Sequence, residues 1–108
     1  MNCLMNSKKT AANKRTQPPR TFEYTRDFLK DWTRLSHSGR YDMVRLKEVM
    51  LLLIANDAPL GAEWEDHSLI GNWDGYRECH VGGDFLLIYQ IENNVISFVR
   101  VGTHATLF

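Results

Sequence analysis

The chain has 108 residues, of which 44% are hydrophobic, and this is enough for one domain around a single core. Its 13 basic and 13 acidic residues balance, but Met1–Arg20 holds five of the basic residues and no acidic one, so Thr21–Phe108 has a formal net charge of −5. An acidic body argues against a general nucleic-acid-binding surface. Any nucleic acid must therefore be bound at a focused site, through the basic N-terminal segment, or with a larger partner.

Two further features bear on the cellular setting. No segment approaches the roughly 18 consecutive apolar residues of a membrane span, and the N-terminal residues lack the apolar stretch and cleavage site of a secretory signal. We therefore expect a soluble, cytoplasmic protein with no membrane partner. Cys3 and Cys79 are too few and too badly placed for a disulfide framework or a zinc motif, so neither is expected to carry chemistry.

The N-terminal residues differ in composition from the rest of the chain. They are polar and basic and end in Pro18 and Pro19, a pattern typical of disorder. We predict a disordered basic tail over residues 1–19 and a folded domain over residues 20–108, which opens with a short strand at Arg20–Tyr24.

Two helices are predicted after this strand. Thr25 can cap the first, in which apolar residues recur at helical spacing as far as Leu35. The second spans about Tyr41–Asn56 and carries one apolar stripe, and Pro59 ends the helical region. Two antiparallel helices joined by so short a turn leave an apolar surface that a sheet must cover.

Three β-branched or aromatic-rich strands can form that sheet after a loop over Ala58–Trp73. They are expected at Gly75–Val81, Phe85–Ile91 and Val95–Val101. The connections between them are short and contain glycine or asparagine, as tight hairpins require, so the strands form a meander. The order is β-α-α-β-β-β, in the α+β class, with a helical hairpin packed on a small, mainly antiparallel sheet.

A scattered polar set accompanies these strands. Because the strands are antiparallel, His80 and Asp84 are neighbours at one hairpin, and the end of the last strand returns to the same place. We therefore expect four of the residues to surround one concave patch at the sheet edge: His80, Asp84, Arg100 and His104. His67 lies in the preceding loop, and His37, in the turn between the helices, is interpreted as a solvated residue.

These residue types suit one chemistry in particular. Cleavage of RNA by its own 2′-hydroxyl needs a base, an acid and stabilisation of a charged phosphorane, which histidines, a carboxylate and an arginine can supply. The same types also fit a surface cluster or a metal site, although the spacing is not that of helical or finger-type zinc sites and no metal is expected. Residue types alone leave these interpretations open.

Other side chains near the set have two interpretations each. Phe85 and Phe108 could stack on unpaired bases, or pack in the core and dock the chain end. Glu78 lies two residues before His80 on a strand and so faces the same side, as a proton-handling carboxylate or as a surface charge. Trp64 and Trp73 are expected to pack the long loop onto the body.

Four ordered blocks carry a family resemblance. They are Glu65–Gly71 (EDHSLIG), Gly75–Val81 (GYRECHV), Asp84–Tyr89 (DFLLIY), and Arg100–His104 (RVGTH) with the terminal Leu107 and Phe108. Over Thr21–Phe108 the chain resembles the YafQ branch of the RelE/ParE toxin superfamily. It departs from the usual pattern at Phe85, where the family commonly has tryptophan, and at Glu78, where aspartate is common.

The resemblance implies a type II toxin that cuts messenger RNA, usually in the ribosomal A site, without metal or cofactor, and that a cognate antitoxin holds inactive. The expected products are a 2′,3′-cyclic phosphate and a 5′-hydroxyl. The resemblance assigns acid/base catalysis to His67, His80, Asp84 and His104, phosphate binding to Arg100, and the role of a functional C-terminal aromatic to Phe108. We also expect Phe85 and Phe108 to stack on RNA, and Arg77 and Glu78 to support the catalytic residues.

Two hypotheses from different classes follow. The first is a ribosome-dependent RNA endonuclease with a cognate antitoxin. The alternative is a non-catalytic toxin on the same scaffold, like the gyrase-inhibiting ParE branch, or a degenerate toxin that only binds its antitoxin. The histidines discriminate between them, because a catalytic His80 or His104 could not be replaced by alanine without loss of cleavage.

Overall fold

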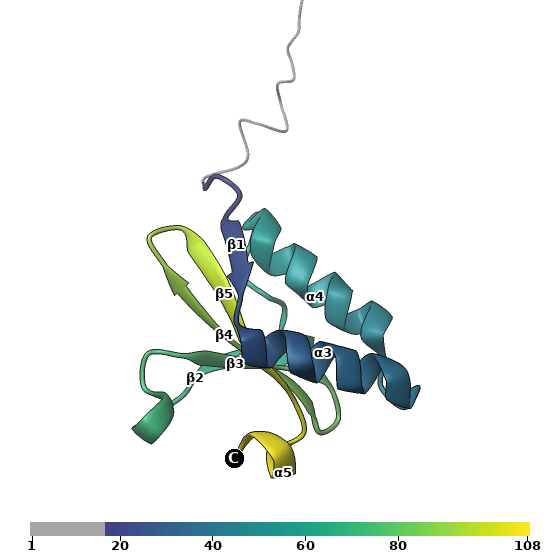
Figure 1. Cartoon of the computed structure of the whole chain (residues 1–108). Helices are drawn as coiled ribbons and strands as arrows, with labels where there is room; N and C mark the ends of the chain where they lie inside the picture. Colours follow the sequence, from purple (N-terminus) through teal and green to yellow (C-terminus); the bar gives the residue numbers. More distant parts are fainter. Residues whose placement is uncertain (1–16) are drawn as a thin grey trace, which may run out of the picture.

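The computed structural model describes residues 17–108, so most of the predicted tail, with Cys3, lies outside the described residues. Figure 1 shows a single sheet with the two long helices on one side of it. The strands are β1 (Thr21–Tyr24), β2 (His67–Ser68), β3 (Arg77–Gly82), β4 (Phe85–Glu92) and β5 (Val95–Gly102). Their order in the sheet is β1-β5-β4-β3-β2, with β1 parallel to β5 and the other pairs antiparallel.

The helices are α3 (Arg26–Ser38), α4 (Met43–Ala55) and the short α5 (His104–Leu107). As predicted, Thr25 caps α3, because its hydroxyl accepts a 3.0 Å hydrogen bond from the Phe28 amide. Asn56 ends α4 in the left-handed conformation with φ 57°. The predicted α+β class and β-α-α-β-β-β order are confirmed, and β2 and α5 are additions to that order.

The predicted loop over Ala58–Trp73 contains more structure than expected. It includes the 3₁₀ turns η1 (Ala62–Trp64) and η2 (Gly71–Trp73) and, between them, strand β2. Trp64 is buried as expected, and the guanidinium carbon of Arg45 lies 4.0 Å from the centroid of its ring. The loop is therefore anchored to the body at Trp64, a few residues before His67.

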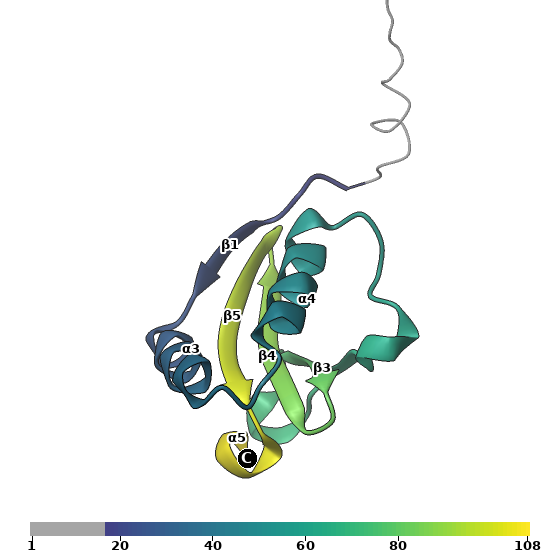
Figure 2. The ribbon, with the colours of Figure 1, turned by 90° about the vertical axis from the view of Figure 1, so that its right-hand side faces the viewer.

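Both faces of the sheet carry apolar residues, in clusters of unequal size. The larger core lies between the sheet and the two long helices, and Figure 2 shows α4 in front of β4. A smaller cluster on the opposite face contains Leu86, Ile88 and Leu107, so α5 packs on the face that α3 and α4 leave uncovered. Successive side chains of a strand point to opposite faces of the sheet, so the long strands β4 and β5 contribute residues to both clusters.

This alternation places two of the predicted site residues. On β3, Cys79 and Val81 are fully buried in the helix-side core. Glu78 and His80 therefore project from the opposite face, as the sequence predicted for this pair. Burial raises the pKa of the Cys79 thiol to about 12, which agrees with the expectation that this cysteine is inert.

The start of the folded part differs slightly from the prediction, which extended the tail to residue 19. The carbonyls of Pro18 and Pro19 accept 3.0 Å hydrogen bonds from the side-chain amides of Asn56 and Asn94. These two prolines are thus held on the body. Among residues 17–108, no helix has the length and apolar character needed to cross a bilayer.

Candidate active site

Three histidines from different elements lie in a row on the face that α5 covers. The ring centroids of His67 on β2 and His80 on β3 are 6.1 Å apart, and those of His80 and His104 on α5 are 6.3 Å apart. The side chains of His67 and His104 are half exposed, and that of His80 is about one-fifth exposed. Residues separated by up to 37 positions in the chain thus form one accessible set, here called the histidine row.

At one end of the row, Asp84 holds His104. Its Oδ1 lies 2.5 Å from His104 Nδ1 and also accepts a 3.2 Å hydrogen bond from the His104 amide. The hydrogen bond from the imidazole, together with that from the amide, keeps the pKa of the Asp84 carboxyl below its usual value. Asp84 is therefore a carboxylate at neutral pH. It binds Nδ1 and leaves His104 Nε2 facing outward.

At the other end, Glu78 is buried between two imidazoles. Its side chain is only 3% exposed, and its Oε1 lies 3.2 Å from His67 Nε2 and 3.6 Å from His80 Nε2. The sequence left open whether Glu78 is a surface charge, and its burial excludes that alternative. A carboxylate so removed from water requires a proton or a cation beside it.

The hydrogen-bond partners of His67 define where its protons lie. Its Nδ1 is 2.9 Å from the carbonyl oxygen of Glu65, and a carbonyl only accepts, so Nδ1 carries a hydrogen. The lone pair of a neutral His67 then sits on Nε2, facing Glu78. The 3.2 Å between His67 Nε2 and Glu78 Oε1 is a hydrogen-bond distance, so one hydrogen shared between these two atoms makes their contact favourable.

The same residues could also hold a metal ion. His67, Glu78 and His80 each offer one ligand atom, and these atoms all lie within 4.8 Å of one another. Two imidazoles and a carboxylate are a donor set that zinc and copper accept. The expectation of no metal therefore stays a prediction.

Arg100 is engaged away from the histidine row. Its Nε and Nη2 donate to the carboxylate of Asp31 on α3, at 2.7 and 3.1 Å, and the Val101 amide donates to the same carboxylate at 3.1 Å. Burial alone would raise the pKa of Asp31, but these hydrogen bonds outweigh it, so its pKa lies below the usual value. Of the four residues expected around one patch, the structure brings His80, Asp84 and His104 together. Arg100, on β5, instead binds Asp31 on α3.

The two predicted stacking residues differ in position. Phe85 is only 5% exposed and packs on Tyr41 in the helix-side core, with ring centroids 4.9 Å apart. A base could stack on Phe85 only if its ring left the core. Of the two interpretations of Phe85, packing in the core is therefore the one that this structure shows. Phe108 is 55% exposed, and its ring centroid lies 5.8 Å from that of His104 and 6.0 Å from that of Trp73. Phe108 alone of this pair offers a ring face beside the row.

The chain is related to known toxins. Residues 20–108 match the family described as bacterial toxin of type II toxin-antitoxin system, YafQ. The mRNA interferase toxin YafQ of Escherichia coli K12 is 45% identical over 89 residues, which cover 82% of this chain and 96% of that protein. The crystal structure of YafQ from E. coli BL21(DE3), 44% identical, covers 82% of this chain and 98% of that one, with a TM-score of 0.76. The chain belongs to the YafQ toxin family. A structure of the E. coli DinJ-YafQ toxin-antitoxin complex is also similar, at 44% identity and a TM-score of 0.75, covering 83% of this chain and 98% of that one.

Sequence reasoning missed two acidic residues that support the site of this YafQ-family toxin. Asp31 is buried and lies on the same helix face as Phe28 and Leu35, so a charge at an apolar position was its signal. Asp66 precedes His67 and binds Arg77, and nothing in the local pattern indicated that contact.

In this YafQ-family toxin, His104 begins α5 and Phe108 directly follows it. The position of α5 depends on its close contact with Gly102. A capping box between Thr103 and Thr106 begins the helix, and Leu107 docks it in the smaller apolar cluster. A Cβ at Gly102 would lie 2.8 Å from Thr106 Oγ1.

We expect Gly102→Ala to displace α5, to lower the free energy of unfolding by about 1 to 3 kcal/mol and to lower cleavage about tenfold. Urea denaturation and an RNA-cleavage assay measure the two effects. Gly82→Ala is the control, because no atom lies within 4 Å of the added Cβ. Equal behaviour of the two variants would show that contact with Gly102 does not set the position of α5.

Proposed function

We propose that this protein is the toxin of a type II toxin-antitoxin pair and an endoribonuclease that cleaves messenger RNA in the cytoplasm. The observation that carries the proposal is the histidine row with a carboxylate bound at each end, Asp84 to His104 and Glu78 to His67. The relatives support it, since the similar E. coli protein is an mRNA interferase toxin and its structure with DinJ is a toxin-antitoxin complex.

The chemistry is a transesterification within the RNA. His67 Nε2 takes the proton from the 2′-hydroxyl and shares it with Glu78 Oε1, which lies 3.2 Å away, and the 2′-oxygen attacks the adjacent phosphorus. The bond from phosphorus to the 5′-oxygen breaks, and His104 Nε2 gives that oxygen its proton. His80 lies between the two groups and binds the phosphate oxygens. The products are a 2′,3′-cyclic phosphate and a 5′-hydroxyl, and no water or metal enters the step.

Arg100, which lies away from the histidine row, binds a phosphate of a neighbouring nucleotide, and Phe108 binds the RNA beside His104. A guanidinium has five N–H donors, and Asp31 accepts from two of those of Arg100, which leaves three for a phosphate. The exposed ring of Phe108 stacks on an unpaired base beside His104.

The charge of the body supports a role for the ribosome. Thr21–Phe108 is acidic overall, so this surface attracts free RNA weakly. A translating ribosome supplies mRNA already held in an extended form, and the binding energy then comes from the ribosome as well as from the mRNA. The cognate antitoxin holds the protein inactive until it is removed.

The experiment compares RNA cleavage with and without translating ribosomes. We expect cleavage on ribosomes, fragments that end in 2′,3′-cyclic phosphate, no cleavage where a 2′-deoxy nucleotide replaces the target, and activity that survives a metal chelator. Growth inhibition without RNA cleavage would instead support the non-catalytic alternative. Activity lost on chelation and restored by zinc would favour a catalytic metal at His67, Glu78 and His80.

A further inference from the structure

The strand that carries His67 is too short to be held by its backbone alone. β2 has two residues and pairs with β3 through His67 opposite Glu78 and Ser68 opposite Arg77, and the Leu69 amide adds a 2.9 Å hydrogen bond to the Tyr76 carbonyl. So short a pairing is weak, so side chains also define where this strand lies. The position of the His67 ring against Glu78 depends on them.

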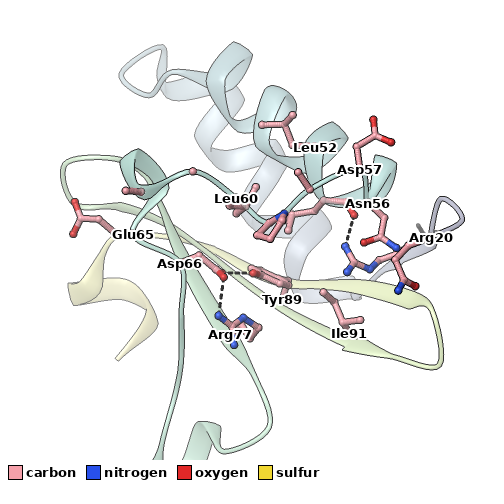
Figure 3. Close-up of a pocket in the computed structure, with 16 residues that line it drawn as sticks. Arg20, Leu52, Asn56, Asp57, Leu60, Glu65, Asp66, Arg77, Tyr89 and Ile91 are labelled. Carbon is pink, nitrogen blue, oxygen red and sulfur yellow. Dashed lines mark hydrogen bonds and ion pairs between the residues drawn. The ribbon is translucent and has the colours of Figure 1, made fainter. Parts of the chain in front are cut away.

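Arg77 binds the residues on both sides of His67. Its Nη2 donates to Asp66 Oδ2 at 2.7 Å, and its Nη1 donates to Ser68 Oγ at 2.8 Å. Figure 3 shows the Arg77 guanidinium directed at Asp66, on the wall of a cavity between the loop and the sheet. One guanidinium on β3 therefore holds the chain before and after His67.

Tyr89, in the core, also binds Asp66. Its side chain is 1% exposed, it lies opposite Arg77 in the β3–β4 register, and its hydroxyl donates to Asp66 Oδ1. Burial and the neighbouring carboxylate raise the pKa of Tyr89, so it remains a donor at neutral pH. Figure 3 shows both interactions meeting at the Asp66 carboxylate. Each oxygen of Asp66 thus has a donor of its own.

The backbone before Asp66 indicates that this arrangement holds the loop against strain. Glu65 has φ 48° and ψ 45°, a left-handed conformation that costs a non-glycine residue about 1 kcal/mol or more. In that conformation the Glu65 carbonyl accepts the Nδ1 hydrogen of His67 at 2.9 Å. Fixing Asp66 therefore also fixes the acceptor that defines which ring nitrogen of His67 faces Glu78.

We propose that Asp66, Arg77 and Tyr89 form a clamp that positions His67 for proton transfer with Glu78. They are positioning residues and do not contact RNA. This inference rests on the proposed ribonuclease function, since it assigns the clamp to one group in that reaction. The Arg77–Asp66 pair is partly exposed, with 38% and 20% of the side chains accessible, so its contribution to stability is small and its effect is on geometry.

The first test removes one hydroxyl. Tyr89→Phe keeps the core ring and deletes the donor to Asp66, and we expect kcat to fall about tenfold with KM changed less than twofold. Tyr24→Phe is the matched control, because that exposed hydroxyl has no hydrogen bond within residues 17–108, and its kcat should match the wild type. Wild-type kcat in Tyr89→Phe would overturn the proposal.

A mutant cycle separates positioning from general damage to the fold. If Tyr89 acts through His67, Tyr89→Phe should lower kcat in the wild type but not in a His67→Ala background, where the group it positions is absent. A merely structural role would lower kcat by the same factor in both backgrounds, and that result would contradict the clamp.

NMR of the histidine rings tests the clamp without RNA. Tyr89→Phe and Asp66→Asn should shift the ring resonances of His67 and leave those of His37 on α3 unchanged. Arg77→Ala should cause a similar shift, which Arg77→Lys should partly reverse because it restores one donor. Unchanged His67 resonances would overturn the clamp even if RNA cleavage is established. Failure of the wild type to cut RNA, with these shifts present, would instead overturn the proposed function.

Discussion

Replacing His104 with alanine should lower the rate of RNA cleavage by about 10² to 10⁴-fold, the usual contribution of an acid or base group. The reason is geometric, because Asp84 binds Nδ1 at 2.5 Å and leaves Nε2 for the proposed proton donation to the leaving 5′-oxygen. The fold should be little changed, since the His104 side chain is 56% exposed. A cleavage assay on translating ribosomes measures the rate, and thermal unfolding checks the fold.

His37→Ala provides the control for this variant. His37 is an exposed histidine in the last turn of α3 and lies outside the histidine row. We expect its cleavage rate to match that of the wild type. If His104→Ala also cleaved RNA at the wild-type rate, His104 would not be the acid. Loss of growth inhibition in His104→Ala without loss of cleavage would show that the two activities are separate.

Replacing Asp31 with asparagine should produce the largest loss of stability, about 2 to 4 kcal/mol in the free energy of unfolding. The carboxylate is buried and accepts from Arg100 at 2.7 and 3.1 Å and from the Val101 amide at 3.1 Å. Asparagine keeps the shape but removes the charge that accepts both hydrogen bonds from the Arg100 guanidinium. Urea denaturation at pH 7 measures the difference, and Glu48→Gln on the exposed face of α4 should stay within about 0.5 kcal/mol of the wild type.

The same substitution should change the dependence of stability on pH. The pKa of Asp31 is lower in the folded protein than its ordinary value of 3.8. Its ionisation therefore stabilises the fold above about pH 4, and this contribution is lost as pH falls through the lower, folded pKa. The gap between wild type and Asp31→Asn should narrow below pH 4. A gap that stays constant down to pH 2 would contradict the assignment.

Most of the fold could be predicted because local chemistry determines it. Thr25 caps α3 through a contact three residues away, and the turns between β3, β4 and β5 contain the glycines and asparagines that such turns require. The two-residue period of a strand likewise placed Glu78 and His80 on one face. Each of these features involves residues close in sequence, so the pattern itself is the evidence.

Long-range side-chain partners could not be predicted in this way. Asp31 and Arg100 are 69 residues apart, and Asp66 and Tyr89 are 23 apart. A bulge between β4 and β5 places Ile88 opposite Arg100 and Tyr89 opposite Phe98, so strict alternation does not indicate where the Arg100 side chain lies. The burial of Phe85 against Tyr41 depends on the packing of the helix hairpin in the same way.

The sequence by itself determined the family, the order of elements and the residue types for acid/base chemistry, because blocks such as Asp84–Tyr89 and the strand period are local properties of the chain. Only the tertiary structure decided which of those residues lie together. In that structure His67 contacts Glu78, His104 contacts Asp84, Arg100 binds Asp31 on α3, and Phe85 is buried. The physical reason is that sheet register and helix packing, and not spacing along the chain, determine which side chains come within hydrogen-bond distance.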